Sequence, residues 1–106
     1  MRDPVEVELC QKLVKKGLTA GYRISVYDGE DCVRYASVRE AEILEVLFET
    51  KLTKLRFLTP IGKHVGDVVL IYGNGEDVIS HWSDNVAINA LIEQVIGQRA
   101  GYPSAG

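Results

Sequence analysis

The segment 66–85, GDVVLIYGNGEDVISHWSDN, constrains the fold of this chain more than any other. It contains two strand-like runs, 67–72 and 77–82, joined by four residues that include Asn74-Gly75. Asn-Gly is the strongest short hairpin signal, because both residues tolerate a positive φ. The first run is apolar at consecutive positions, which is typical of a strand covered on both faces. The segment therefore predicts a tight hairpin whose first strand is buried on both sides.

Three amphipathic segments predict helices: residues 4–16, a stretch that starts after Ser37, and residues 84–96. Each begins at a residue whose side chain can cap a helix, namely Asp3, Ser37 and Asp84. A glutamate three residues after Asp3, and another after Ser37, gives the spacing of a capping box. Gly17 suits a left-handed stop for the first helix. The apolar positions of the second helix, which we expect to be buried, are Val38, Ala41, Leu44, Leu47 and Phe48.

Five segments read as strands because they are rich in β-branched and aromatic residues and are bounded by turn residues. They are residues 22–28, 32–36, 53–58, 66–72 and 77–82. Short turns favour antiparallel pairing, so we predict an α+β fold. It has a single, mostly antiparallel sheet of about five strands and three helices, in the order α-β-β-α-β-β-β-α. No linker divides the chain, so residues 1–97 are predicted to form one domain and 98–106 a flexible tail.

Composition limits the classes of function. No apolar run approaches the roughly 18 residues that a membrane span needs, and no signal peptide opens the chain, so we expect a cytoplasmic protein without a membrane partner. Cys10 and Cys32 are the only cysteines, and we expect them to be reduced. Asp67, Glu76 and Asp77 could form an acidic patch for a hard cation, but their spacing is not that of a calcium loop. We therefore expect no metal and no cofactor.

The chain has a net charge of −3, and its basic residues are unevenly placed. Residues 66–106 contain only one basic residue against five acids, which argues against nucleic-acid docking at the hairpin end. One stretch without any acid contains Lys51, Lys54, Arg56 and Lys63. Lys54 and Arg56 fall on one face of their strand, where they could follow a phosphate backbone. The alternative, which we favour because no aromatic stacking platform accompanies them, is that they protect an edge strand from aggregation.

His81 is the catalytic candidate, because an imidazole held by a nearby carboxylate can act as a general base. Asp84, or alternatively Asp77, would supply that carboxylate in a small hydrolase or transferase. Against this, strand alternation places Ser80 and His81 on opposite faces, and no G-x-S-x-G motif is present. The favoured interpretation of His81 is a half-exposed strand residue.

Trp82, the only tryptophan, closes the last predicted strand. It either completes the core or serves as a binding anchor, and Tyr72 and Tyr27 could share its surface. Three apolar helix faces around a small sheet leave one face to cover. We therefore predict a non-enzymatic protein that acts through protein contacts, including self-association as a homodimer. A nucleic-acid accessory protein that uses the basic strip is the alternative binding function.

Four short patterns resemble those of small uncharacterised bacterial proteins, often of prophage or mobile-element type. They are VYDGE at 26–30, YGNG at 72–75, DVIS at 77–80 and SDN at 83–85. The resemblance implies a fold and a bacterial context. It assigns no functional residue.

Overall fold

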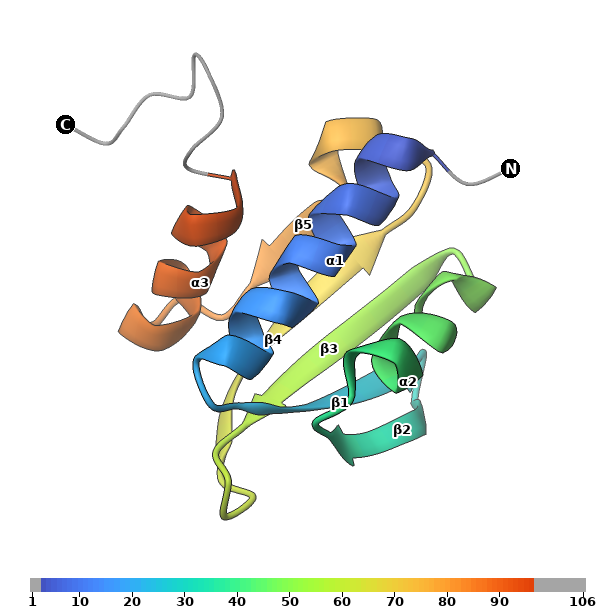
Figure 1. Cartoon of the computed structure of the whole chain (residues 1–106). Coiled ribbons are helices and arrows are strands. Elements are labelled where there is room, and N and C mark those ends of the chain that lie inside the picture. Colours follow the sequence, from blue (N-terminus) through green and yellow to red (C-terminus); the bar gives the residue numbers. More distant parts are fainter. Residues whose placement is uncertain (1–2, 97–106) are drawn as a thin grey trace, which may run out of the picture.

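The computed structural model describes residues 3–96, and its elements follow the predicted order α-β-β-α-β-β-β-α (Figure 1). The helices are α1 (Pro4–Thr19), α2 (Glu40–Glu45) and α3 (Val86–Ile96). The strands are β1 (Arg23–Asp28), β2 (Asp31–Ser37), β3 (Leu52–Leu58), β4 (His64–Ile71) and β5 (Ile79–Trp82). Two short 3₁₀ helices, η1 (Leu47–Glu49) and η2 (Gly75–Asp77), precede β3 and β5. The α+β prediction is confirmed, whereas the predicted tail 98–106 lies outside the described residues.

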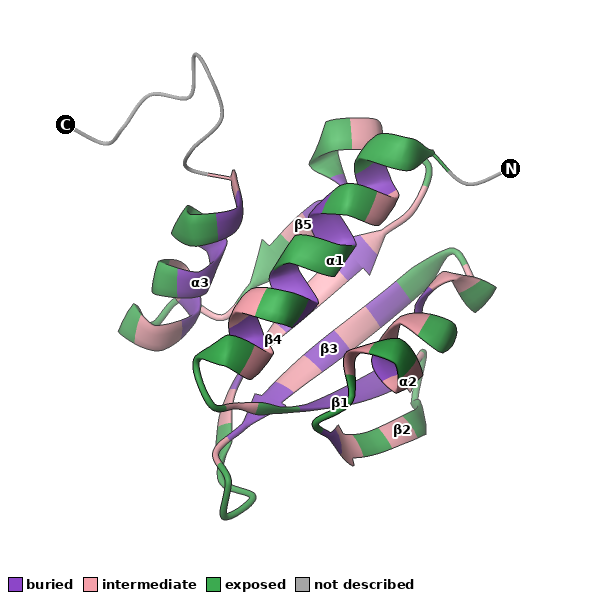
Figure 2. Ribbon diagram, viewed as in Figure 1, coloured by how far each residue is buried: buried purple, intermediate pink, exposed green. Residues whose placement is uncertain are grey.

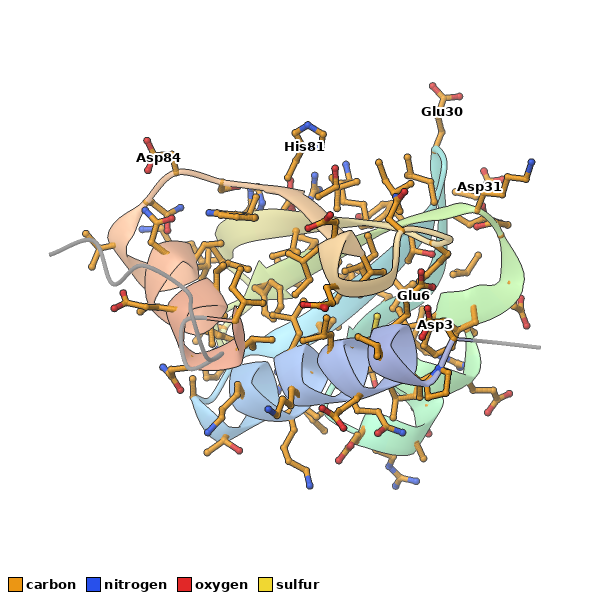
Figure 3. All side chains as sticks on the ribbon, turned by 90° about the horizontal axis from the view of Figure 1, so that it is seen from above. Asp3, Glu6, Glu30, Asp31, His81 and Asp84 are labelled. Carbon is orange, nitrogen blue, oxygen red and sulfur yellow. The ribbon has the colours of Figure 1, made fainter. Side chains whose placement is uncertain are left out.

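The five strands form one sheet in the order β2-β1-β3-β4-β5, and all neighbouring pairs are antiparallel. The three α-helices lie on one side of this sheet, and within the described residues the other side carries no helix (Figures 1 and 3). The basic strand β3 is the central strand, so the prediction that it lies at an edge is wrong. The edge strands are β2 and β5. The sequence did not predict this strand order, because β1 pairs directly with β3 although β2 and α2 lie between them along the chain.

The core lies between the sheet and the helices, and side chains alternate along each strand accordingly (Figure 2). On β4, Val68 and Leu70 are fully buried, whereas Val69 and Ile71 on the opposite face are only half-buried. The prediction that this strand is covered on both faces is therefore wrong. The run of consecutive apolar residues therefore marks an interior strand, although helices cover only one face of this sheet.

Helix α1 starts as predicted, since the Asp3 carboxylate accepts a hydrogen bond from Val5 N at 2.9 Å. It does not stop at Gly17 but continues to Thr19, and Gly21 (φ 95°) is the left-handed residue that follows it. Gly17 has a different role. A Cβ atom on this residue would lie 2.5 Å from the Phe57 ring, so glycine allows α1 to approach β3 closely.

Glu6 does not complete the predicted capping box at Asp3. Its side chain is buried, and Oε2 accepts hydrogen bonds from Gly73 N and Gly75 N, both at 2.8 Å. These glycines lie between β4 and β5, and the Glu6 side chain points from α1 toward this connection (Figure 3). The predicted tight Asn-Gly turn is also wrong, because Asn74 has φ −110° and the chain makes the longer turn that includes η2. Both glycines have positive φ, which turns their amides onto the carboxylate.

The second helix begins later than predicted. Ser37 ends β2 and accepts from Arg39 N at 3.1 Å, so it does not cap α2. The helix therefore starts at Glu40, and its buried residue is Ile43. Of the predicted buried residues, Leu47 is buried, Leu44 and Phe48 are half-buried, and Val38 and Ala41 are exposed.

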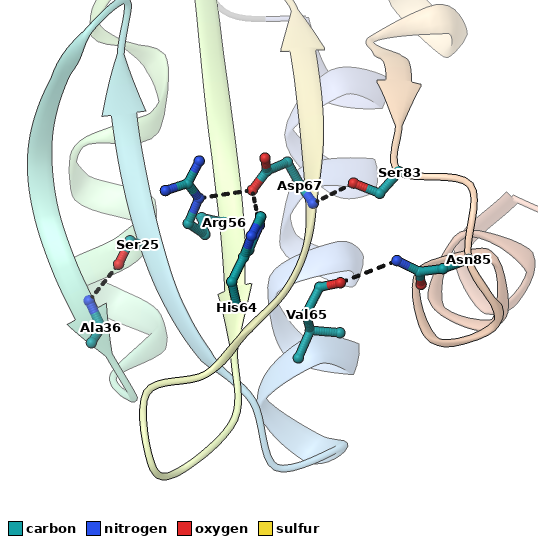
Figure 4. A network of polar contacts seen from close by, with 8 residues as sticks. All are labelled: Ser25, Ala36, Arg56, His64, Val65, Asp67, Ser83 and Asn85. Atoms are coloured by element: carbon teal, nitrogen blue, oxygen red, sulfur yellow. Dashed lines mark hydrogen bonds and ion pairs between the residues drawn. The ribbon is translucent and has the colours of Figure 1, made fainter.

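Asn85 caps α3, where we expected Asp84. The Asn85 Oδ1 atom accepts from Ile88 N at 2.9 Å, and its Nδ2 donates to the Val65 carbonyl at 3.1 Å (Figure 4). Asp84 instead accepts from the Asn89 side chain at 3.0 Å. Asp84 and Asn85 have nearly equal cap propensity, and the second hydrogen bond of Asn85, to Val65 at the start of β4, favours Asn85.

We expect Asn85→Ala to lower the free energy of unfolding by about 1–2 kcal/mol, because it removes the acceptor for an orphan helix amide. Asp84→Ala, one residue earlier, is the matched control, and we expect it to cost less than about 0.5 kcal/mol. Urea unfolding of both variants measures the difference. Equal losses, or a larger loss at Asp84, would contradict the assignment of the cap.

Candidate functional site

The sheet face opposite the helices is the candidate functional site, and we call it the open face. Strand alternation and register assign these residues to it: Tyr27, Leu52, Lys54, Arg56, His64, Asp67, Val69, Ile71 and His81. They come from four of the five strands, between Tyr27 and His81. The predicted site residues Lys54, Arg56 and His81 are thus brought to one surface.

One row of the open face crosses four strands. Tyr27 pairs with Lys54, Lys54 with Val69, and Val69 with His81. The Lys54 ammonium lies 5.2 Å from the centre of the Tyr27 ring, and the Arg56 guanidinium lies 5.1 Å from it. Both distances suit cation–π attraction. Tyr27 was not predicted as the aromatic neighbour of this pair, because no local pattern shows that β1 pairs with β3.

Asp67 is the centre of a polar network on the same face (Figure 4). Its Oδ1 atom lies 3.0 Å from Arg56 Nε and 3.0 Å from His64 Nε2. Its backbone N–H donates to Ser83 Oγ at 2.9 Å, and its carbonyl accepts from Ser83 N at 2.9 Å. Asp67 does not cluster with Glu76 and Asp77 as a cation patch would require, and the described residues contain no group of three side chains that could hold a metal ion.

The network shifts the pKa of both of its charged partners. Partial burial alone would raise the pKa of Asp67, but hydrogen bonds from Arg56 and His64, with their charges, outweigh burial and hold it below its usual value. The hydrogen bond to Asp67 raises the pKa of Arg56 despite partial desolvation. Both groups are therefore ionised at neutral pH, and much of the positive charge of Arg56 is neutralised within the face.

His81 is exposed on the edge strand β5, and its ring nitrogen Nδ1 lies 2.8 Å from Ser80 Oγ. The prediction that Ser80 and His81 lie on opposite faces assumed regular alternation. The register between β4 and β5 shifts at this point, so Ser80 is an additional residue in the ladder and its hydroxyl reaches the neighbouring imidazole. The Asp84 carboxylate binds Asn89 and lies apart from His81 (Figure 3). This arrangement does not place Asp84 where it could orient His81.

Trp82 and Tyr72 lie on the helix side of the sheet but contact different elements, so they do not form one binding surface. Trp82 is 36% exposed and its Nε1 donates to Asn89 Oδ1 of α3 at 3.0 Å. The Tyr72 hydroxyl donates to the Leu47 carbonyl, and its ring packs against Phe48 at 5.2 Å between centroids. Both residues thus face the helix side, whereas Tyr27 lies on the open face.

Two hollows on the described part of the chain have a defined lining, and neither lining includes His81. One, of about 500 Å³, is lined by residues 32–39 and Glu42. The other, of about 340 Å³, is lined by Phe48, Glu49, Thr50, Lys51, Tyr72 and Gly73. An enzyme that used His81 would need a cleft that holds the substrate beside it. Neither hollow supplies that cleft.

The basic residues do not form a continuous track. Lys51 precedes β3 and Lys63 precedes β4, at opposite ends of the basic strand. Lys12 and Lys15 are exposed on α1, in the layer on the other side of the sheet from Lys54. Continuity between these groups would have favoured nucleic-acid binding, and the fold separates them.

The structure defines a small α+β domain with one covered and one open sheet face. No family of proteins matches the chain, and neither curated proteins nor solved structures give a significant match. The resemblance to small bacterial proteins therefore stays a hypothesis. Within residues 3–96 no helix has both the length and the apolar character required to cross a lipid bilayer.

Proposed function

We propose that this chain is a non-enzymatic, cytoplasmic protein-binding domain, and that a second copy of the chain occupies its open face. The observation that carries the proposal is the open face itself, on which apolar side chains lie beside charged ones and which no helix of residues 3–96 covers.

The composition of the open face suits a protein partner better than a phosphate backbone. Leu52 (42% exposed) pairs with Ile71, and Val69 lies on the same side of β4, which gives an apolar strip. Beside the strip lie charges of both signs, Lys54 and Asp67 among them. A surface with apolar, cationic and anionic regions can complement its own copy across a two-fold axis.

The size of the face supports a weak rather than a permanent dimer. The four strands of the open face at about 4.8 Å spacing, with up to seven residues at about 3.3 Å rise, give a face of roughly 19 by 23 Å. Two copies would then bury on the order of 900 Å², within the range of weak and transient protein interfaces. We therefore expect a reversible equilibrium between monomer and dimer.

Sedimentation across about 5–500 µM, a range that suits a weak interface, tests this proposal. We expect the mean mass to rise with concentration toward twice the chain mass. Val69→Glu places a charge in the apolar strip and should keep the protein monomeric throughout. Val86→Glu makes the same chemical change at a residue that is 88% exposed on α3, and it should leave the equilibrium unchanged.

Two results would overturn the proposal: a strict monomer at every concentration, or a dimer that Val69→Glu leaves intact. The nucleic-acid alternative predicts instead that binding to mixed RNA and DNA falls steeply with salt. In that case, Lys54→Gln should reduce the slope by about one unit for the lost phosphate contact.

A further inference from the structure

His81 lies next to the apolar strip of the open face. In the ladder between β4 and β5 it pairs directly with Val69, which belongs to that strip. Its side chain is exposed and points away from the helices (Figure 3). A second copy that covers Val69 would therefore also remove the imidazole of His81 from water.

The neighbours of His81 on β5 and on the connections at either end of the strand do not balance a positive charge on its ring. The Nδ1 atom lies 2.8 Å from Oγ of Ser80, which is a neutral group. Asp84 follows β5, and its carboxylate accepts a hydrogen bond from Asn89. The acids of η2 come before β5 begins. No ion pair within residues 3–96 includes His81.

The charged groups on the neighbouring strands do not balance it either. Asp67 of β4 lies on the same face, but its Oδ1 atom is already bonded to Arg56 and His64 (Figure 4). Lys54 of β3 lies in the same row as His81, two strands away, and adds a positive charge to that row. A proton on His81 would thus place a second cation beside the apolar strip.

The other histidine of the open face differs in this respect. His64 Nε2 lies 3.0 Å from Asp67 Oδ1, so a carboxylate balances a proton on His64. Burying an unpaired charge in an interface is costly, whereas a paired and hydrogen-bonded charge costs much less. Of the two histidines, His81 is therefore the one whose protonation opposes a covering copy.

We propose that self-association through the open face is pH-sensitive, and that protonation of His81 releases the second copy. This inference rests on the proposed function. Histidine is the side chain whose charge ordinarily changes between about pH 5 and pH 8. The dimer binds fewer protons at His81 than two monomers do, so it is most stable above this range and weakens as the pH falls through it.

The net charge of the whole chain gives the opposite trend. Its value of −3 becomes smaller in magnitude as protons are bound, and weaker self-repulsion favours association. Weaker dimerisation at lower pH would therefore point to a local group on the interface.

Sedimentation at about pH 8 and about pH 6, at equal ionic strength, tests the proposal. Near pH 6 roughly three-quarters of ordinary histidine side chains are protonated, and a dimer contains two copies of His81. We expect the dissociation constant to rise about 5- to 15-fold from the higher to the lower pH. His81→Gln should dimerise equally at both pH values, and His81→Lys, which is always charged, should dimerise weakly at both. His64→Gln is the matched control and should keep the rise.

Circular dichroism at both pH values verifies that each variant is folded. A dimer of the unmodified protein whose dissociation constant is the same at both pH values would overturn the pH dependence and leave the proposed function standing. An equal rise in His81→Gln would assign the effect to another group and would also overturn this inference. A strict monomer at both pH values would overturn the proposed function and this inference with it.

Discussion

Leu70→Ala should lower the free energy of unfolding by about 2–5 kcal/mol, whereas Ile71→Ala should cost about 1 kcal/mol or less. Sequence alone predicts equal losses, since both residues lie in one apolar run. The structure separates them, because Leu70 is fully buried beneath the helices and Ile71 lies half-buried on the open face. A cavity forms only where the surrounding atoms cannot close around the lost methyl groups.

Chemical denaturation of both variants measures this difference. The protein should be kept at low concentration, because association through the open face would add to the apparent cost at Ile71. A loss at Ile71 equal to that at Leu70 in a monomeric sample would show that the open face is covered, and the assignment of the two faces would then be wrong.

Glu6→Ala should destabilise the protein by about 2–4 kcal/mol, because it removes a buried carboxylate that accepts from the part-buried amides of Gly73 and Gly75. Glu6→Gln keeps the size and one acceptor oxygen, so its cost should be smaller, about 1–2 kcal/mol. Glu8→Ala is the control on the same helix, since Glu8 is exposed, and it should cost less than about 0.5 kcal/mol.

Amide hydrogen exchange gives this prediction a local readout. Protection of Gly73 and Gly75 should fall in Glu6→Ala before the central strands lose theirs. If Glu6→Ala and Glu8→Ala were equally stable, the two hydrogen bonds would contribute nothing, and the connection between β4 and β5 would be held by packing alone.

Local sequence patterns predicted a strand or a helix cap correctly where no neighbouring residue offered a competing signal. Strand β3 has the predicted alternation, with Leu55 and Phe57 buried and Lys54 and Arg56 on the other face. Asp3 caps α1 because no other acceptor competes with it. At the start of α3, Asp84 and Asn85 compete, and a tertiary bond to Val65 favours the second residue.

Long-range pairing could not be predicted in the same way. Glu6 has the spacing of a capping box, but amides far along the chain bind its carboxylate. The residues of the candidate site could not be grouped from local patterns either. The sequence placed Lys54 and Arg56 on one face, whereas their partners Tyr27 and Asp67 come from strands on either side, and only the strand order brings them together. The edge at β2 is likewise a property of the sheet order rather than of its own residues.

The Glu6 hydrogen bonds also govern how this chain can be synthesised. They join residues 67 and 69 positions apart, so the first helix cannot make its final contacts until Gly75 has left the ribosome. At translation rates of about 5–20 residues per second, the delay is roughly 3–14 s. During that time a carboxylate within an apolar helix face opposes premature burial of that face. We therefore expect α1 to reach its native packing only after the connection between β4 and β5 has been synthesised.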